Sequence, residues 1–392
     1  MIDSLYIAWK YVTFNKVKTT ILITSITLIV FLPLALQVLL NASEQQLRAR
    51  AGETPLLVGA SGSALDLVMN SLYFSDNVSQ FINMRAAEQI DDSGLAVSIP
   101  LYVRFHACGF PVVGTSLDYF DFRGLEVKEG HMLAMLGECV IGSEVAERLG
   151  LGAGDSLILS PENLFDIAGV YPLKMKVTGV LAANHSADDT AVFVDTRTTW
   201  VMQGLGHGHE DVTLTRDSSV VLQRDERNVT ANAKLLHYTE ITEANLGSFH
   251  FHGDEKDYPL TAVSALPRDT RSATLLRGRY LEDKQYQITR PDDVIDSLME
   301  NIFRIKNVID AVIVIVGFAT VLTLLLVFVL SLRLRQGEID TVFRIGCSRL
   351  TVVRLLAAEI LIIAVVSAGR CAALLWLVQA NSSGLVRSLI LH

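Results

Sequence analysis

The sequence predicts a membrane protein with an α-helical transmembrane part and a large α+β extracytoplasmic domain carried on helical stalks. Three observations predict it: apolar runs at residues 19–40, 308–332 and 355–379, a short arginine-rich loop between the last two runs, and an acidic block between the first two. Each run is long enough to cross a bilayer as a helix, which needs about 20 residues because every backbone N–H and C=O must be paired within the segment.

The charges beside the apolar runs predict the orientation. Residues 1–18 contain three lysines, and the loop at residues 333–354 contains five arginines. Short basic loops stay in the cytoplasm, so we expect the N-terminus and this loop inside and residues 41–305 outside. With three spans, the tail at residues 380–392 is then extracytoplasmic.

The first two segments are interpreted from their length and polarity. Residues 1–18 place apolar side chains among lysines and predict an amphipathic helix on the inner membrane surface. The run at residues 19–40 exceeds the apolar core of a secretory signal peptide, about 7–15 residues, and therefore indicates an uncleaved span. Pro33 inside it is expected to kink the helix or to mark its outer third.

The outer block is strongly acidic. Residues 41–305 hold 22 of the 33 Lys and Arg residues and 37 of the 42 Asp and Glu residues, which gives a net charge of −15. Binding to nucleic acid needs basic patches, so this charge argues against a nucleic-acid partner.

The outer block is predicted to begin and end with stalk helices. The polar residues after Leu40 are expected to continue the first helix, and a second helix is expected to start after Pro291, where Asp292 and Asp293 suit a helix N-terminus. Further predicted elements are a helix at residues 64–73, strands between residues 96 and 195, a helix that Ser143 caps and Gly150 ends, and strands at residues 219–222, 234–239 and 260–265.

The four cysteines are divided by the predicted topology. Cys347 lies in the cytoplasmic loop and Cys371 in a span, whereas Cys108 and Cys139 both lie outside. An oxidising compartment would permit a disulfide between the outer two, and two free thiols are the alternative.

Two closely spaced histidine pairs lie in the outer block. His207 and His209 form one pair, and His250 and His252, followed by Asp254, form the other. Residues i and i+2 of a strand share a face, and imidazoles with a carboxylate are a ligand set for zinc or copper. Exposed loop histidines of an acidic domain are the alternative.

Three stretches resemble the periplasmic core domain of MacB-like ABC transporter permeases: VIGSEVAERLGLGAGDSLIL (140–159), FDIAGVY (165–171) and MKVTGVLAANHSADDTAVFVD (175–195). The loop stretch EIDTVFRIGCS (338–348) and Glu359 of LLAAE resemble the FtsX-like permease domain. The resemblance covers nearly the whole chain and implies a bacterial inner-membrane, multi-pass protein with its large domain in the periplasm. That family normally has four spans, whereas the residues after 380 are too few to cross a bilayer. We therefore expect either a permease with three spans and its C-terminus outside or a chain that is shortened relative to its relatives.

The sequence contains no P-loop motif, so ATP and Mg²⁺ would be bound by another chain, and no enzymatic activity is expected of this one. The resemblance implies a cytoplasmic ABC ATPase dimer that docks on the loop, where apolar and charged residues alternate as in a docking site. The alternative is that the loop arginines only anchor the membrane surface. The candidate coupling residues are Glu338, Ile339, Val342, Phe343, Arg344, Gly346 and Glu359.

Three functions fit these features. The first is a homodimeric mechanotransmitting permease that moves its periplasmic domain to export or extract a substrate. The second is a permease that extracts lipoproteins or lipids, and the third is an FtsX-like regulator of a cell-wall hydrolase. Membrane lipid surrounds the chain in each case, and the resemblance also allows a periplasmic adaptor or substrate-binding protein as a partner.

Overall fold

The computed structural model describes residues 2–77, 80–160, 172–208, 221–225, 228–231, 239–334, 336–337, 344, 346 and 349–381. The chain forms two compact units. One comprises Gln46–Leu298, and the other combines the residues before Gln46 with those after Leu298. Two helices, α2 (Lys16–Glu53) and α9 (Pro291–Leu334), contribute residues to both units.

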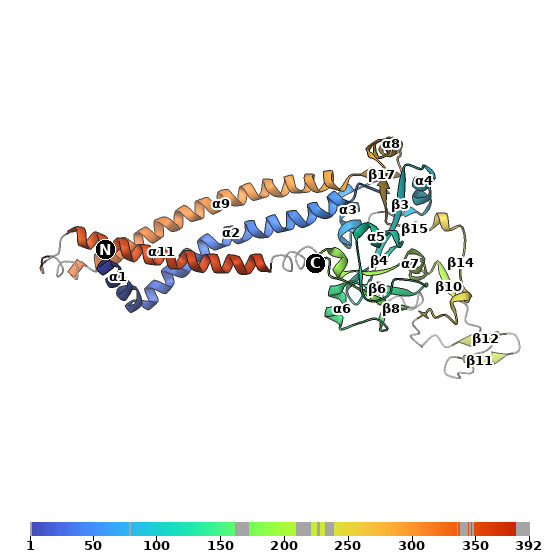
Figure 1. Ribbon diagram of the computed structural model, residues 1–392, viewed down its shortest axis with the longest axis horizontal. Coiled ribbons are helices and arrows are strands. Elements are labelled where there is room, and N and C mark those ends of the chain that lie inside the picture. Colours follow the sequence, from blue (N-terminus) through green and yellow to red (C-terminus); the bar gives the residue numbers. More distant parts are fainter. Residues whose placement is uncertain are drawn as a thin grey trace. The chain divides into compact units, whose positions relative to one another are not determined.

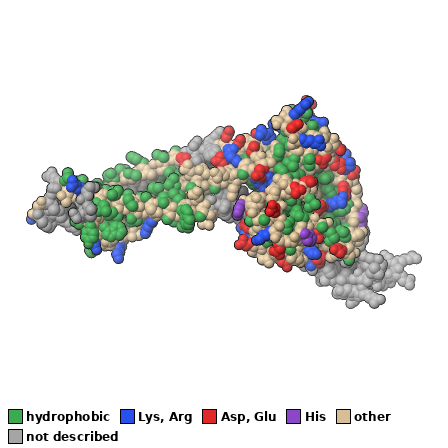
Figure 2. Space-filling model, viewed as in Figure 1, with side chains coloured by type: hydrophobic (Ala, Val, Ile, Leu, Met, Phe, Trp, Pro, Cys, Tyr) green, Lys and Arg blue, Asp and Glu red, His purple; other side chains and the backbone are tan. Residues whose placement is uncertain are grey.

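The second unit is helical and apolar. Besides parts of α2 and α9 it contains α1 (Ile2–Phe14) and α11 (Arg349–Ala380), and Figure 2 shows hydrophobic side chains over much of its surface. Among the described residues, Thr19–Glu53 and Leu350–Ala380 are long and apolar enough to cross a membrane, and Asp310–Ala319 of α9 is a shorter apolar stretch. Whether residues 308–332 of α9 form a span of their own stays a prediction.

Small polar side chains join α2 and α11 within this unit. The Thr27 hydroxyl donates to the Ile23 carbonyl at 2.7 Å and lies 3.5 Å from the Ser367 carbonyl, and the Ser367 hydroxyl lies 3.5 Å from the Ile23 carbonyl. Small hydroxyl side chains of this kind donate their hydrogen bonds to helix carbonyls, and their small size allows close packing between membrane helices. Pro33 lies inside α2, and this helix continues past Leu40 to Glu53, as the sequence predicted of the residues after Leu40.

The unit Gln46–Leu298 is built on an 11-stranded mixed sheet with the order β13-β8-β6-β9-β4-β3-β16-β1-β17, in which β5 and β7 also pair with β8 (Figure 1). The pairs β13–β8, β6–β8 and β4–β9 are parallel, and the other pairs are antiparallel. The strands are β1 (Leu56–Ala60), β3 (Ala96–Ala107), β4 (Phe110–Thr115), β5 (Val127–Gly130), β6 (Glu138–Ile141), β7 (Ser156–Ile158), β8 (Leu173–Leu181), β9 (Val192–Asp195), β13 (Thr239–Glu240), β16 (Ala262–Pro267) and β17 (Tyr286–Thr289).

Short helices and three small strand pairs make up the rest of this unit as far as its residues are described. The strand pairs are β2 (Ile82–Asn83) with β15 (Pro259–Leu260), β10 (Gly206–Gly208) with β14 (Phe249–Phe251), and β11 (Val221–Asp225) with β12 (Asn228–Ala231). The helices are α3 (Ala64–Tyr73), α4 (Arg85–Asp92), α5 (Asp118–Arg123), α6 (Ser143–Leu149), α7 (Thr196–Met202), α8 (Thr270–Tyr280) and the 3₁₀ turns η1 (Ala187–Thr190), η2 (Leu246–Ser248) and η3 (Glu255–Asp257).

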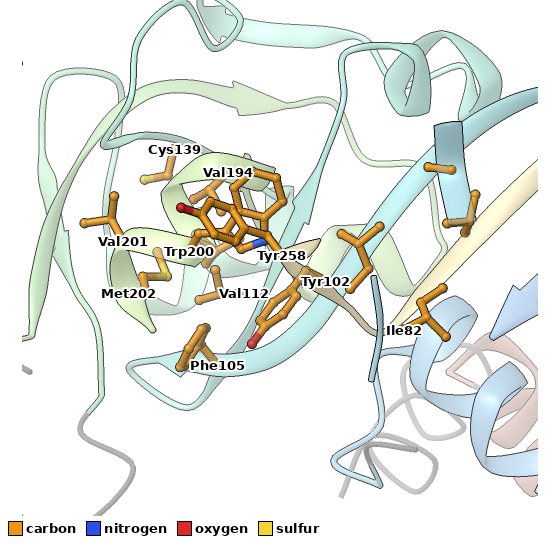
Figure 3. Close-up of a cluster of buried hydrophobic side chains, with 14 of the residues drawn as sticks. Ile82, Tyr102, Phe105, Val112, Cys139, Val194, Trp200, Val201, Met202 and Tyr258 are labelled. Carbon is orange, nitrogen blue, oxygen red and sulfur yellow. The ribbon is translucent and has the colours of Figure 1, made fainter. Parts of the chain in front are cut away.

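Aromatic residues lie at the centre of the hydrophobic core of the sheet unit (Figure 3). Trp200 packs edge-on against Tyr258 with ring centroids 4.9 Å apart, and its indole N–H donates to the Pro259 carbonyl at 2.9 Å. The hydroxyl of the buried Tyr102 donates to the Gln203 side-chain oxygen at 2.8 Å. These aromatic residues bury large apolar areas while their polar atoms keep partners.

Most of the locally predicted elements are confirmed. The helix at residues 64–73 is α3, Gly150 ends α6 at a φ of 65°, and residues 260–265 divide between β15 and β16. The predicted strand at residues 219–222 overlaps β11, and that at residues 234–239 lies almost wholly outside the described residues.

The expected cap of α6 was wrong. Gly142 is the N-cap in an extended conformation, and Ser143 is the first helical residue. The two outer cysteines are free thiols, Cys108 exposed and Cys139 buried.

Candidate functional site

A buried ion pair holds the last turns of α2 on the sheet unit. The Arg50 guanidinium donates to both carboxylate oxygens of Asp188, from Nη1 to Oδ2 at 2.6 Å and from Nη2 to Oδ1 at 2.8 Å. Its Nη2 also donates to the Tyr119 hydroxyl at 2.9 Å, and its Nε donates to the Leu72 carbonyl. The side chain of Arg50 is only 7 % exposed and that of Asp188 only 1 %. We call Arg50, Asp188 and Tyr119 the Arg50 network.

The Asp188 carboxylate is held from its other side as well. The Tyr119 hydroxyl donates to Oδ1 at 2.8 Å, and the Ser186 hydroxyl donates to Oδ2 at 2.9 Å. Ser186 also caps η1, because its hydroxyl accepts from the Asp188 backbone N–H at 3.2 Å. Together, these contacts hold the Asp188 carboxylate in one orientation, facing Arg50.

Gly142 allows η1 to lie close to the start of α6, in the position from which Asp188 contacts Arg50. A Cβ atom at Gly142 would overlap the backbone carbonyl oxygens of Asp188 and Asp189. The Gly142 N–H donates to the Ala191 carbonyl at 2.9 Å, which ties the start of α6 to the end of η1. The glycine of the stretch VIGSE thus permits a close approach that no other residue allows.

Replacing Gly142 with Ala should destabilise the sheet unit by about 1–3 kcal/mol, because backbone must shift to admit the methyl group. Denaturant unfolding can be followed by the fluorescence of Trp200 in a chain whose Trp9 and Trp376 are Phe. Gly247→Ala is the matched control, since nothing lies within 4 Å of its Cβ position. Equal stability of the two variants would contradict the explanation.

The Arg50 and Asp188 side chains stay charged although both are buried. Burial alone would lower the pKa of Arg50, but Asp188 and Tyr119 beside it raise this pKa above the ordinary value. Burial alone would raise the pKa of Asp188, but the Arg50 charge and hydrogen bonds lower it below the ordinary value. Burial raises the pKa of Tyr119 to about 12, so its hydroxyl stays a neutral donor.

A second buried arginine lies beside the first. Arg123 donates to the Thr54 hydroxyl at 2.8 Å and lies 3.4 Å from the Glu53 carboxylate, and burial, followed by the nearby Arg50, lowers its pKa. Its Nε atom has no hydrogen-bond partner among the described residues. Arg123 therefore contacts both Glu53, the last residue of α2, and Thr54, the residue after it.

The first turns of α9 lie next to the same end of α2. Arg48 and Asp296 form an ion pair with side chains 43 % and 54 % exposed, and a Cβ atom at Gly52 would lie 3.4 Å from the Asp292 carboxylate. The Tyr73 hydroxyl donates to the Leu47 carbonyl at 2.5 Å. The end of α2 thus contacts α3, α5, η1 and α9, and its only deeply buried ion pair among the described residues is Arg50–Asp188.

The predicted coupling residues are described only in part. Arg344 is exposed, Gly346 lies in a turn at a φ of 96°, as expected of a sharp turn, and Glu359 is buried in α11. Outside the described residues lie Glu338, Ile339, Val342 and Phe343. Their role in docking an ATPase stays a prediction.

His207 of the first histidine pair lies opposite His250 of the second. The two residues are register partners in β10 and β14, and the rings of His250 and His252 stand 4.7 Å apart. Asp254 accepts from the Lys256 N–H as the cap of η3, and His209 lies outside the described residues. No group of three metal-ligating side chains occurs among the residues that the structure describes, so the zinc or copper site stays a prediction.

Sequence reasoning missed the Arg50 network. Asp188 lies inside a stretch quoted for the resemblance, and Arg50 lies in the predicted stalk helix, but nothing local connects two residues 138 positions apart. The available signal was a pair of adjacent aspartates, Asp188 and Asp189, which end two residues before the apolar strand β9.

The chain was compared with known proteins. The family described as "MacB-like periplasmic core domain" matches residues 19–235, more than half of the chain. No curated protein matches the chain. Similar solved structures include the periplasmic region of MacB from Actinobacillus actinomycetemcomitans (12 % identity, 63 % of this chain and 93 % of that chain, TM-score 0.36) and the extracellular domain of the noncanonic ABC-type transporter YknZ from Gram-positive bacteria (11 %, 60 % and 98 %, 0.33). A domain of a putative permease from Porphyromonas gingivalis is also similar (11 %, 60 % and 88 %, 0.30).

The family match agrees with the sheet unit and with the apolar helices that begin before it and follow it. The protein is a membrane protein with an extracytoplasmic domain of mixed α/β fold. The chain therefore belongs to the MacB-like periplasmic core domain family of ABC transporter permeases.

Proposed function

We propose that this chain is the transmembrane subunit of an ABC transporter that works by mechanotransmission. A separate cytoplasmic ATPase dimer docks on residues 333–354 of two copies of the chain. ATP binding and hydrolysis move the membrane helices, and α2 carries this movement to the extracytoplasmic domain. The observation that carries the proposal is the Arg50 network at the end of α2.

The Arg50 network is better suited to transmitting a movement of α2 to the sheet unit than to raising the stability of the fold. A buried ion pair is often no more stabilising than apolar residues of the same volume, because removing two charges from water costs about as much as their attraction returns. A bidentate arginine–carboxylate contact does fix one mutual orientation of its partners. The sheet unit would therefore follow a rotation or shift of the α2 end rather than slip past it.

The position of the Arg50 network also explains why a movement of α2 would reach the middle of the domain. Asp188 lies in the turn between β8 and β9, and β9 pairs with β4 and β6 in the interior of the sheet. Tyr119 packs against Phe193 of β9 with ring centroids 5.6 Å apart. A displacement of Arg50 is thus applied to interior strands and not to an edge.

The proposal can be tested by spin labels on the exposed Cys108, in a chain whose Cys347 is Ser and whose Cys139 and Cys371 are buried. The full chain with its ATPase, reconstituted in lipid nanodiscs, should show a change in the distance between the two Cys108 labels when ATP binds. Arg50→Met should remove most of this change while ATP hydrolysis continues.

Arg48→Met is the matched control, because Arg48 lies two residues away on α2 and its ion pair with Asp296 is exposed. It should retain the ATP-dependent change. An unchanged label distance in the wild-type chain, or the same response in Arg50→Met and Arg48→Met, would refute the proposed mechanism.

A further inference from the structure

One helix of the acidic extracytoplasmic domain is basic. The segment at residues 268–279, which contains most of α8, has four arginines and one aspartate, a net charge of +3. The aspartate, Asp269, is used as the helix cap, since its carboxylate accepts from the Ser272 N–H at 2.6 Å. None of the four arginines forms an ion pair within the part of the chain that the structure describes. Figure 2 shows basic side chains, with acidic ones among them, at the end of the domain where Figure 1 places α8.

The outward face of α8 has a regular pattern. Ala273, Leu276 and Tyr280 pack toward the core of the sheet unit. On the opposite side Arg271, Leu275 and Arg279 follow at i, i+4 and i+8, so they form one stripe along the helix. Leu275 is 50 % exposed, and the nearby Leu281 is 82 % exposed.

An acidic surface lies directly beside α8. The helix α4, residues 85–92, and the turn at residues 254–257 together carry six acidic and two basic residues, a net charge of −4. Two ion pairs, Arg85–Asp257 and Lys256–Glu88, join α4 to this turn. We call residues 85–92 and 254–257 the acidic surface.

The basic helix and the acidic surface share one face of the sheet. Leu276 of α8 and Ile90 of α4 belong to the same core cluster, and both helices pack against β3 and β16. The Arg268 N–H at the start of α8 donates to the Leu95 carbonyl, just after α4, at 3.2 Å. The face is therefore positive on one side and negative on the adjacent side.

We propose that this face binds the same face of a second copy of the chain about a twofold axis. In that arrangement α8 of each copy lies against the acidic surface of the other. A twofold contact needs a self-complementary surface, and adjacent patches of opposite charge are self-complementary when one copy is turned against the other.

The residue types suit such a contact. Arginine guanidinium groups bind carboxylates bidentately, and Leu275 between Arg271 and Arg279 supplies an apolar centre with a charged rim. The inference rests on the proposed homodimer and specifies where the two extracytoplasmic domains meet.

A photocrosslinking amino acid in place of Leu275 tests it in membranes that hold the full chain and its ATPase. Irradiation should join two copies of the chain, and peptide mapping should place the adduct within residues 85–92 or 254–257 of the other copy. The same crosslinker in place of Leu117, which is 54 % exposed beside α5, should give no such adduct.

Charge reversal sharpens the test. Arg271→Glu with Arg279→Glu should lower the yield about tenfold or more, and so should Asp92→Arg with Glu255→Arg, because each places like charges together. The four substitutions combined should restore the adduct, since each copy then offers the opposite pair. A missing adduct, an adduct with another protein or with lipid alone, or a failure of the combined variant to restore the yield would overturn the inference.

The ATPase that purifies with each variant separates the two proposals. A normal share of ATPase with no Leu275 adduct would refute only this contact. The specific adduct without any ATPase would refute the transporter mechanism and leave the contact standing.

Discussion

Asp188→Asn is expected to destabilise the extracytoplasmic domain by about 3–5 kcal/mol, because it leaves the Arg50 guanidinium buried without a counter-charge. Arg50 is only 7 % exposed and cannot regain its hydration without breaking the packing at the end of α2. Denaturant unfolding followed by Trp200 fluorescence measures the change. Arg50→Met with Asp188→Leu should recover at least half of the loss, because both charges are then absent.

The matched control is Asp296→Asn, which removes the ion pair between Asp296 of α9 and Arg48 of α2. That pair is exposed, so its loss should change the free energy of unfolding by less than about 1 kcal/mol. Equal effects of the two asparagine variants would show that burial of the Arg50–Asp188 pair does not matter.

The pair also predicts a pH dependence. Arg50 holds the pKa of Asp188 below its ordinary value although burial opposes this. The stability from the pair is therefore fully present above the unfolded-state pKa of about 4, and it is lost as the pH falls through the folded-state pKa. Asp188→Asn should remove that part of the acid sensitivity.

Phe343→Asp is expected to release the ATPase or to uncouple its hydrolysis while the membrane helices and the sheet unit stay folded. The sequence predicts that Phe343 is an apolar anchor of the docking loop, and a charge buried there would have no partner. The measurement is the amount of ATPase that purifies with the variant and its rate of ATP hydrolysis.

Arg349→Ala is the control for the loop. Arg349 is the first residue of α11, and its expected role is to anchor the helix at the membrane surface, so its loss should have a much smaller effect. If Phe343→Asp retains a normal share of coupled ATPase, residues 333–354 are not the coupling element.

The sequence by itself determined the features that depend on local pattern. The length of the apolar runs predicted long helices, and α2 and α11 have the length and composition of spans. Alternation and glycine placement predicted the strands of residues 96–195 and the end of α6, because strand pleating and a left-handed helix end are properties of a few neighbouring residues. The stretches at residues 140–195 also indicated the family that the comparison confirmed.

Only the tertiary structure decided which distant residues meet. Arg50 and Asp188 are 138 positions apart. The pairing of β6 with β9 and the close approach of η1 to Gly142 place Asp188, and the contacts of the end of α2 with Tyr73 and Arg123 place Arg50. The basic α8 and the acidic α4 became neighbours through β16 and β3, which are adjacent in the sheet but far apart in the chain. Pattern in a sequence records each element's own periodicity and charge, whereas sheet order and side-chain pairing depend on how all the elements share one core.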